Sequence, residues 1–215
     1  MKTIKIRRKI LKKNEEQAKR LRDLLKKNEI FTINLLGSPG AGKTSILEKV
    51  IKRFIPGKKI AVIEGDLYTD RDAERLEKYG VQVVQVNTGG ACHLEANMVR
   101  KAVNKLNLNE IKLLVIENVG NLVCTASYDL GEDIKITVLS VPEGSDKLLK
   151  YPQIFHKAEV MVINKIDLIE HTNFNIKDIK NDLKQMNKNI QTFKLSCKTG
   201  EGVNELCNYL EGKLK

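Results

Sequence analysis

The chain is poor in aromatic side chains and has no long apolar run. It holds five Phe, five Tyr and no Trp among 215 residues, which leaves little aromatic surface for stacking on bases, so we expect no nucleic-acid binding. It has no run of about eighteen apolar residues, and its basic N-terminus lacks the apolar segment and cleavage site of a secretory signal. We therefore expect a cytoplasmic protein that does not engage a membrane.

Cysteine is also scarce, with four residues in the whole chain: Cys92, Cys124, Cys197 and Cys207. A cytosolic protein of this length does not depend on disulfides for its fold, so we expect free thiols or metal ligands. Hydrophobic residues make up 41% of the sequence, which is enough to build a core, and the length is typical of one globular unit.

Acidic residues are outnumbered, with 27 Asp and Glu against 38 Lys and Arg and a net charge of +11. The basic residues crowd the first thirty positions, and the rest of the chain is closer to neutral. Between about residues 11 and 28, Leu and Ala recur at helical spacing among these charges, which predicts a basic amphipathic helix within residues 1–29. We expect this helix to lie on the domain edge and to precede the core, either as a solvated face or as a docking surface for an acidic partner.

From residue 30 onward, short apolar runs alternate with helical patterns. This alternation predicts an α/β domain over residues 30–215, with a mostly parallel sheet covered by helices on both faces. The expected strands are Ile30 to Leu36, Ile60 to Ile63, Val81 to Val86, Ile111 to Ile116, Ile134 to Ser140, Val160 to Ile163 and Gln191 to Leu195. The expected helices are Lys43 to Phe54, Asp70 to Lys78, His93 to Leu106, Tyr151 to His156, Asn175 to Met186 and Val203 to Leu214.

A glycine-rich loop follows the first predicted strand. Residues 37–44 read G-S-P-G-A-G-K-T and match the phosphate-binding pattern G-x-x-x-x-G-K-[ST], with a strand before it and a helix after it. Glycines let successive N–H groups point at phosphate oxygens, and the helix N-terminus adds positive potential. Lys43 should reach the β- and γ-phosphates, and the Thr44 hydroxyl should bind Mg²⁺. The expected nucleotide contacts are Gly37, Ser38, Gly40, Ala41, Gly42, Lys43, Thr44 and Ser45.

A second motif, N-K-I-D at residues 164–167, follows another buried strand. It resembles the base-reading motif of GTPases, with Asn164, Lys165 and Asp167 as its polar members. The Asp167 carboxylate can accept hydrogen bonds from N1 and the 2-amino group of guanine, which adenine cannot supply, so we expect GTP and GDP as ligands. Ser196, Cys197 and Lys198 resemble the weaker third base contact, although a plain loop after a strand explains them nearly as well.

Two acidic residues compete for a role beside the magnesium ion, because each ends a predicted strand at the phosphate edge. These are Asp66 and Glu117. We expect Asp66 and Thr44 as direct Mg²⁺ ligands, with Glu117 acting through water. Asp72 lies in the first turn of the next predicted helix and can approach the metal or water, whereas Asp70 is expected to cap that helix. We expect the catalytic groups Lys43, Asp66, Asp72 and Glu117 to support slow hydrolysis by positioning and charge neutralisation.

Thiol and imidazole groups follow two neighbouring predicted strands. Cys92 and His93 come after the strand ending at Val86, and Cys124 comes after the strand that precedes Glu117. Strand ends of one sheet can bring the three residues together near the nucleotide, and their chemistry suits Ni²⁺, Zn²⁺ or Cu. Considered by themselves, two buried thiols and a surface imidazole explain the same pattern.

Four segments resemble the HypB family of GTPases, which incorporate nickel into [NiFe]-hydrogenase and are close relatives of the urease accessory GTPase UreG. The segments are E-G-D-L-Y-T-D-R-D-A from Glu64, N-T-G-G-A-C-H-L-E-A from Asn87, I-E-N-V-G-N-L-V-C from Ile116 and S-V-P-E-G from Ser140. The resemblance covers roughly residues 30–210 and implies a P-loop GTPase of the SIMIBI class. It also implies a Ni²⁺ or Zn²⁺ site at Cys92, His93 and Cys124 that is linked to the GTP state.

The sequence departs from the family pattern at its N-terminus, where neither a Cys-x-x-Gly-Cys motif nor a His-rich tract is present, and at Thr125, where Pro is common. Neither change removes one of the three ligands. Because three ligands are one short of a tetrahedral shell, we expect a homodimer in the GTP state that pools the ligands of two chains.

The resemblance implies two partners, a nickel-binding accessory protein and the hydrogenase large-subunit precursor. Two alternatives stay open. The first is a UreG-like GTPase that delivers nickel to urease, against which the missing Cys-Pro-His element argues. The second is a regulatory GTPase that controls a protein partner, in which Cys92, His93 and Cys124 have no role in metal binding.

Overall fold

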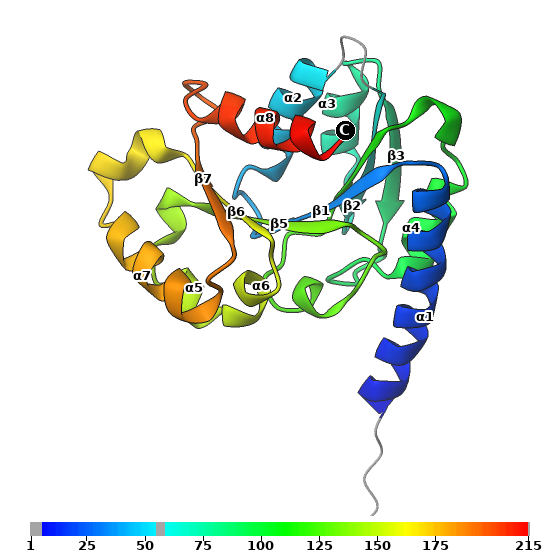
Figure 1. The fold of residues 1–215 in the computed structure, drawn as a ribbon, viewed down its shortest axis with the longest axis horizontal. Helices are drawn as coiled ribbons and strands as arrows, with labels where there is room; N and C mark the ends of the chain where they lie inside the picture. The colour runs from blue at the N-terminus through cyan, green and yellow to red at the C-terminus, as the bar shows by residue number, and fades with distance from the viewer. Residues whose placement is uncertain (1–5, 55–58, 215) are drawn as a thin grey trace, which may run out of the picture.

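The computed structural model describes residues 6–54 and 59–214, without the side chains of residues 6–10. A seven-stranded sheet forms the centre of the molecule (Figure 1), and its strand order is β3-β2-β4-β1-β5-β6-β7. All six strand pairings are parallel. The strands are β1 Phe31–Gly37, β2 Ile60–Asp66, β3 Gln82–Asn87, β4 Leu113–Glu117, β5 Ile134–Ser140, β6 Val160–Asn164 and β7 Gln191–Lys194.

Helices cover both faces of this sheet, as the alternating pattern predicted. On one face, α2, α3 and α8 bury a cluster that includes Leu47, Leu76 and Leu206. On the opposite face, α1 and α4 cover β2 and β4, while α5, α6 and α7 cover β5 and β6. The helices are α1 Ile6–Lys27, α2 Lys43–Phe54, α3 Arg71–Glu77, α4 Ala96–Val103, α5 Lys147–Lys150, α6 Pro152–His156, α7 Ile176–Met186 and α8 Val203–Lys213.

The strand order places β1 between β4 and β5, so that β2, β3 and β4 lie on one side of β1 and β5, β6 and β7 lie on the other. In open parallel sheets a ligand binds outside the carboxyl ends of the strands at such a point. The loop that follows β1 is the glycine-rich segment, and the ends of β2, β4 and β6 lie at the same edge. The topology therefore assembles every predicted motif along one edge.

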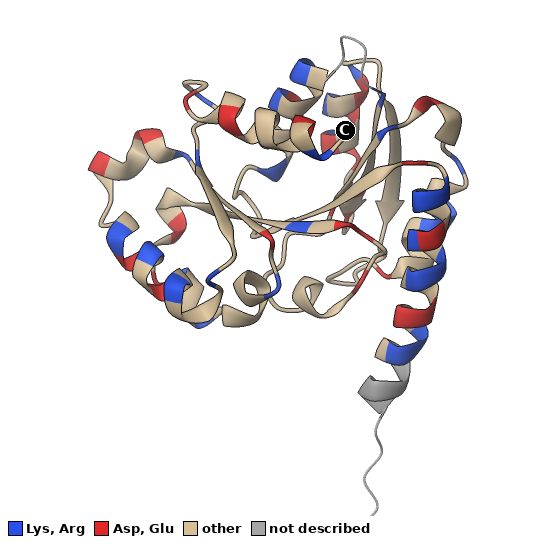
Figure 2. Cartoon of the chain, viewed as in Figure 1, with Lys and Arg blue, Asp and Glu red and all other residues tan. Residues whose placement is uncertain are grey.

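The N-terminal helix contributes more to the core than we expected. Leu21 and Leu25 of α1 are fully buried and belong to the cluster beneath α4, so the helix is part of the core that it was expected to precede. Lys and Arg recur along its exposed side (Figure 2). Within the described residues, no helix is both long and apolar enough to cross a membrane.

Two helices begin later than predicted, and one predicted helix cap lacks its side-chain hydrogen bond. The helix expected from His93 begins only at Ala96, because residues 91–95 form a loop. The helix expected from Tyr151 begins at Pro152, and α5 precedes it as a separate turn, because Tyr151 has non-helical φ and ψ angles of −128° and 56°. Asp70 occupies the N-cap position of α3, but its side chain makes no capping hydrogen bond.

Candidate functional site

The loop between β1 and α2 has the backbone geometry of a phosphate cradle. Gly40 and Gly42 have φ angles of 73° and 93°, which side-chain-bearing residues rarely adopt. A Cβ atom on Gly42 would overlap Nδ2 of Asn164, so the loop also lies too close to the next motif for any larger residue. Since α2 begins at Lys43, the amide groups at its N-terminus are directed toward the loop.

Lys43 and Thr44 are both buried at the start of α2, with 7% and 6% of their surfaces exposed. The Lys43 ammonium donates only long hydrogen bonds, 3.4 Å to the Gly37 carbonyl and 3.3 Å to the Ser38 carbonyl. A buried cation with such weak partners is suited to a phosphate group. The Thr44 hydroxyl donates a 2.9 Å hydrogen bond to Oε1 of Glu117, so its lone pairs remain available to a metal ion.

Glu117 has a neighbour that the sequence did not single out. Glu64 on β2 is paired in register with Glu117 on β4, and both carboxyl groups are almost fully buried. One oxygen of each, Oε2, has no hydrogen-bond partner. Burial raises the pKa of Glu64 to about 8, helped by repulsion from Glu117, and burial raises the pKa of Glu117 to about 7. Two unsatisfied carboxylates beside a threonine hydroxyl form a donor set that suits Mg²⁺.

Asp66 and Asp72 line the same cavity, which has a volume of about 500 Å³. Asp66 accepts backbone hydrogen bonds of 2.8 Å from Tyr68 and Thr69 at one oxygen, Oδ1. Asp72 accepts a 2.8 Å bond from Arg75, whose guanidinium also binds Glu48 on α2. The structure thus adds Arg75 to Lys43 and Lys165 as a cation on the cavity wall, which spacing alone did not indicate.

The polar residues of the N-K-I-D motif line an adjoining cavity, together with Ser45, Cys197 and Lys198. Asn164 donates from its side chain to the Ala41 carbonyl at 2.9 Å, and Lys165 donates to the Gly40 carbonyl at 2.7 Å. Lys165 has a φ angle of 62°, a strained conformation for lysine. These bonds hold the base motif against the phosphate loop.

Asp167 is oriented by a serine from the neighbouring strand end. The Ser196 hydroxyl donates to Oδ1 of Asp167 at 2.5 Å and accepts 3.2 Å bonds from the amides of Lys198 and Thr199. Burial raises the pKa of the Cys197 thiol to about 11, so this cysteine is a neutral part of the wall. The predicted third base contact, Ser196 to Lys198, therefore lies beside Asp167 of the N-K-I-D motif.

Cys92, His93 and Cys124 meet in space as the strand ends predicted. Their sulfur and nitrogen atoms all lie within 4.8 Å of one another, and Sγ of Cys92 is 3.7 Å from Nδ1 of His93. Burial lowers the pKa of His93, and Glu95, at 3.9 Å from Nε2, partly opposes this change. The imidazole is therefore neutral at pH 7, which is the form that binds a metal ion. Its ring stacks on Tyr128 at a centroid distance of 3.8 Å.

The cluster and the phosphate cavity share one loop. A Cβ atom on Gly120 would lie 2.9 Å from Pro39 in the phosphate loop, so the two segments are in direct contact. The Asn121 amide donates to the Gly37 carbonyl at 3.1 Å, while its side chain accepts from the amides of Val123 and Cys124. Asn121 therefore joins the phosphate loop to the segment that contains Cys124.

A second asparagine joins the two ligand loops to each other. The buried Asn118 accepts hydrogen bonds from the amides of Leu94 and Val119, at 3.2 Å and 3.0 Å. Leu94 directly follows His93, and Val119 lies on the loop that leads to Cys124. The sequence did not indicate Asn118 or Asn121, because an isolated asparagine in a loop is ordinarily a turn residue.

The chain is similar to known proteins along almost its whole length. The model of the CobW/HypB/UreG nucleotide-binding domain matches residues 31–194. Hydrogenase maturation factor HypB of Azotobacter vinelandii is 44% identical over 97% of this chain and 69% of its own length. Hydrogenase/urease maturation factor HypB of Helicobacter hepaticus is 43% identical over 99% of this chain and 88% of its own. The crystal structure of Helicobacter pylori HypB in complex with nickel has a TM-score of 0.90 at 41% identity, covering 94% of this chain and 95% of that one.

Proposed function

The chain belongs to the CobW/HypB/UreG family of nucleotide-binding proteins and is a P-loop GTPase of the SIMIBI class, and we propose that it delivers nickel to a hydrogenase precursor. The observation that carries the proposal is the convergence of Cys92, His93 and Cys124 within 4.8 Å beside the phosphate cavity. Two thiols and a neutral imidazole suit a borderline cation such as Ni²⁺ or Zn²⁺, whereas the carboxylates of the cavity suit Mg²⁺.

The two cavities divide the nucleotide between them. The phosphate loop with Lys43 holds the phosphates, and Asp167 accepts hydrogen bonds from guanine while Ser196 keeps its carboxylate in place. Adenine offers no donors at those positions, so it would leave Asp167 unpaired in a partly closed cavity. GTP and GDP are therefore the ligands that the polar groups select.

Thr44 and Asp66 would hold Mg²⁺. Glu117 accepts a hydrogen bond from the Thr44 hydroxyl, and Glu64 is paired in register with Glu117. The fit rests on the two buried carboxylate oxygens that lack a partner and on the raised pKa values of their groups. When bound, the ion would supply charge neutralisation at the β- and γ-phosphate oxygens. Lys43, Arg75 and Lys165 are the protein cations that line the same cavity among the described residues.

Hydrolysis relies on positioning, because no residue of the cavity is placed as an obvious general base. Asp72 is neutralised by Arg75, which leaves it better suited to orienting water than to removing a proton. Catalysis of this kind is slow without a partner, and slow turnover suits a timer for metal delivery.

Nucleotide state reaches the metal ligands through the loop at residues 118–124. Gly120 contacts Pro39, and Asn121 binds the Gly37 carbonyl, so a γ-phosphate that reshapes the phosphate loop also moves the backbone at Cys124. We propose that GTP orders this loop and the one at residues 89–93, and that two chains then dimerise and pool their ligands. Hydrolysis loosens the dimer and releases the metal ion.

We place this cycle in the cytoplasm, with two partners: a nickel-binding accessory protein and the hydrogenase large-subunit precursor. The relatives support the recipient, since they are named hydrogenase maturation factors. The Helicobacter hepaticus relative is named a hydrogenase/urease maturation factor, which keeps urease as an alternative recipient. A regulatory GTPase without a role in metal binding is the remaining alternative.

Metal titration in defined nucleotide states tests the proposal. Purified protein would be loaded with GDP or a non-hydrolysable GTP analogue, titrated with Ni²⁺ and Zn²⁺, and examined by sedimentation, alongside Cys92→Ala and Cys124→Ala. We expect stoichiometric binding that requires both cysteines, and more dimer with the analogue. Metal binding unaffected by either substitution would favour the regulatory GTPase. Equal dimer content in both states would remove the dimerisation step.

A further inference from the structure

A buried asparagine on α1 connects that helix to both loops that carry the metal ligands. Asn14 is 6% exposed although it lies on a helix rich in charge. Its side-chain amide donates a 2.7 Å hydrogen bond to the Asp129 carbonyl, and its oxygen accepts a 2.8 Å bond from the Ala96 amide. One side chain therefore joins three segments that are far apart in the sequence.

The bond from the Ala96 amide fixes the loop of Cys92 and His93. Ala96 is the first residue of α4 and lies three positions after His93, and Glu95 at the N-cap makes no side-chain capping bond. The Asn14 oxygen takes the place of that missing cap from another helix. It thereby sets where α4 begins and where the loop before α4 ends.

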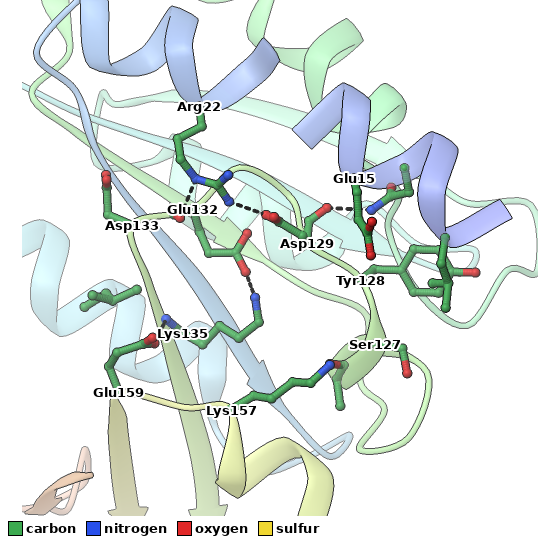
Figure 3. A pocket seen from close by; sticks show the side chains of 14 residues that line it. Glu15, Arg22, Ser127, Tyr128, Asp129, Glu132, Asp133, Lys135, Lys157 and Glu159 are labelled. Carbon is green, nitrogen blue, oxygen red and sulfur yellow. Dashed lines mark hydrogen bonds and ion pairs between the residues drawn. The ribbon is translucent and has the colours of Figure 1, made fainter. Parts of the chain in front are cut away.

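The bond to the Asp129 carbonyl fixes the segment that follows Cys124. Asp129 directly follows Tyr128, whose ring stacks on the imidazole of His93 at 3.8 Å. The Asp129 carboxylate is itself held by Arg22 at 2.6 Å and by the Gly131 amide at 2.8 Å. Figure 3 shows Arg22 of α1 reaching Asp129, with Tyr128 next to it. Asp129, the residue next to Tyr128, is thus bound to α1 through both its carbonyl and its carboxylate.

From this geometry we infer that Asn14 is a positioning residue for the metal site, which fixes the His93 imidazole against Tyr128 and toward both cysteines. The inference rests on the proposed metal site and adds a function for the buried side of α1, a helix for which the sequence suggested only a solvated face or a docking surface. Groups that orient metal ligands from outside the coordination shell typically change affinity by about 10- to 100-fold when they are removed.

Ni²⁺ titration of matched asparagine variants tests this role. Asn14→Ala removes both bonds, and Asn14→Asp keeps an acceptor for the Ala96 amide while losing the donor to Asp129. Asn28→Ala is the control, because Asn28 lies just after α1 and its side chain bonds only to the Leu24 carbonyl among the described contacts. We expect Asn14→Ala to weaken Ni²⁺ binding about tenfold and to alter the thiolate-to-metal charge-transfer band, with Asn14→Asp intermediate and Asn28→Ala unchanged.

Thermal unfolding and GTP turnover of each variant separate positioning from simple stabilisation. A purely structural asparagine would lower the melting temperature and leave the Ni²⁺ affinity and spectrum of the folded protein as in wild type, which would overturn the inference. Should Asn14→Ala not fold, Asn14→Asp is combined with Tyr128→Leu. We expect the double variant to lose no more affinity than Tyr128→Leu alone, because both changes act through the same stack, and additive losses would contradict this.

Failure of the inference differs from failure of the proposed function. Wild-type protein that binds no Ni²⁺ through Cys92 and Cys124 removes the proposed function. Wild-type protein that binds Ni²⁺ through these residues, while Asn14→Ala binds it as tightly as Asn28→Ala does, removes only the role of Asn14.

Discussion

The phosphate cavity and the thiol and imidazole cluster lie at the same edge of the sheet but are built differently. Lys43, Thr44, Glu64 and Glu117 are charged or polar groups on regular elements, and all are more than nine-tenths buried. Cys92, His93 and Cys124 are only partly buried and lie on loops. The cavity gathers buried ionisable groups on strands and a helix, whereas the cluster gathers two thiols and an imidazole on loops.

Because of this difference, we propose that the cavity binds the nucleotide and that the cluster responds to the nucleotide that is bound. A cavity built on strands and a helix, with a weakly partnered buried ammonium group and two unpaired carboxyl oxygens, is suited to holding the nucleotide and its metal ion. Loops move more easily than strands, so a cluster on loops can be assembled and opened as the nucleotide changes. Asn121 lies between the two regions and contacts both.

The largest effect is expected from removing the buried cation of the cavity. Lys43→Ala should lower GTP turnover about 10³-fold, because the phosphates lose their one buried ammonium partner. Ni²⁺ affinity of the nucleotide-free protein should be unchanged if the two regions are separately built. Turnover and Ni²⁺ titration measure both, with the exposed Lys180→Ala on α7 as control. If Lys43→Ala weakened Ni²⁺ binding as much as GTP turnover, the cavity and the cluster would not be separately built regions.

The next largest effect is expected from removing a thiol of the cluster. Cys92→Ala should weaken Ni²⁺ binding about 100-fold, since it removes one of three ligands, while GTP turnover without metal stays within about twofold of wild type. Cys207→Ala is a suitable control, because Cys207 is buried in the core beside Leu206 and Leu210. A Cys92→Ala protein with wild-type Ni²⁺ affinity would show that the cluster is structural.

A smaller effect is expected at the base end of the nucleotide site. Asp167→Ala should reduce the preference for GDP over ADP about thirtyfold, which corresponds to about 2 kcal/mol for hydrogen bonds to a charged acceptor. Competition between fluorescent GDP and ADP measures the ratio. Ser196→Ala should weaken GDP binding less, because it removes only the hydroxyl that orients Asp167. An unchanged ratio in Asp167→Ala would refute the assignment of the base motif.

The smallest effect concerns pH and the buried carboxyl pair. The folded-state pKa values of Glu64 and Glu117, about 8 and about 7, lie above the ordinary value of 4.5. The folded protein therefore binds more protons than the unfolded chain, and the stability that protonation provides is lost as the pH rises toward 8. Without nucleotide and Mg²⁺, Glu64→Gln should melt about 3 °C above wild type at pH 8 and alike at pH 5, as measured by calorimetry.

Adding Mg²⁺ and GDP should abolish the higher melting temperature of Glu64→Gln at pH 8, because the ion then compensates the negative charge of Glu64 and Glu117. Glu48→Gln is a matched control, since Glu48 lies on α2 and binds Arg75 instead of facing Glu117. If Glu64→Gln melts at or below wild type at every pH, the cavity stores no unbalanced charge, and its contrast with the cluster disappears.

Local pattern was enough to predict the motifs and most of the fold. The phosphate loop, the N-K-I-D motif and the βα alternation are read over short windows, and the structure contains each of them. The meeting of Cys92, His93 and Cys124 also followed from strand ends lying at one edge. The division of the chain at residue 29, and the roles of the individual site residues, stay predictions.

Residues whose importance depends on distant partners were missed. Glu64 became notable only when register placed it beside Glu117, and Asn14 only when α1 packed against α4. The bonds of Asn14 reach 82 and 115 positions along the sequence, a separation at which no spacing rule operates. Arg75 and Tyr128 were missed for the same reason, because their partners come from other elements or loops.

The central claim is that nucleotide state controls the metal site. Its most direct test is Ni²⁺ titration of the same protein loaded with Mg²⁺ and GDP or with Mg²⁺ and a non-hydrolysable GTP analogue, with Cys92→Ala in parallel. We predict that the Ni²⁺ dissociation constant differs at least about tenfold between the two states, and that Cys92→Ala abolishes the difference. Equal Ni²⁺ affinity in both states would contradict the account.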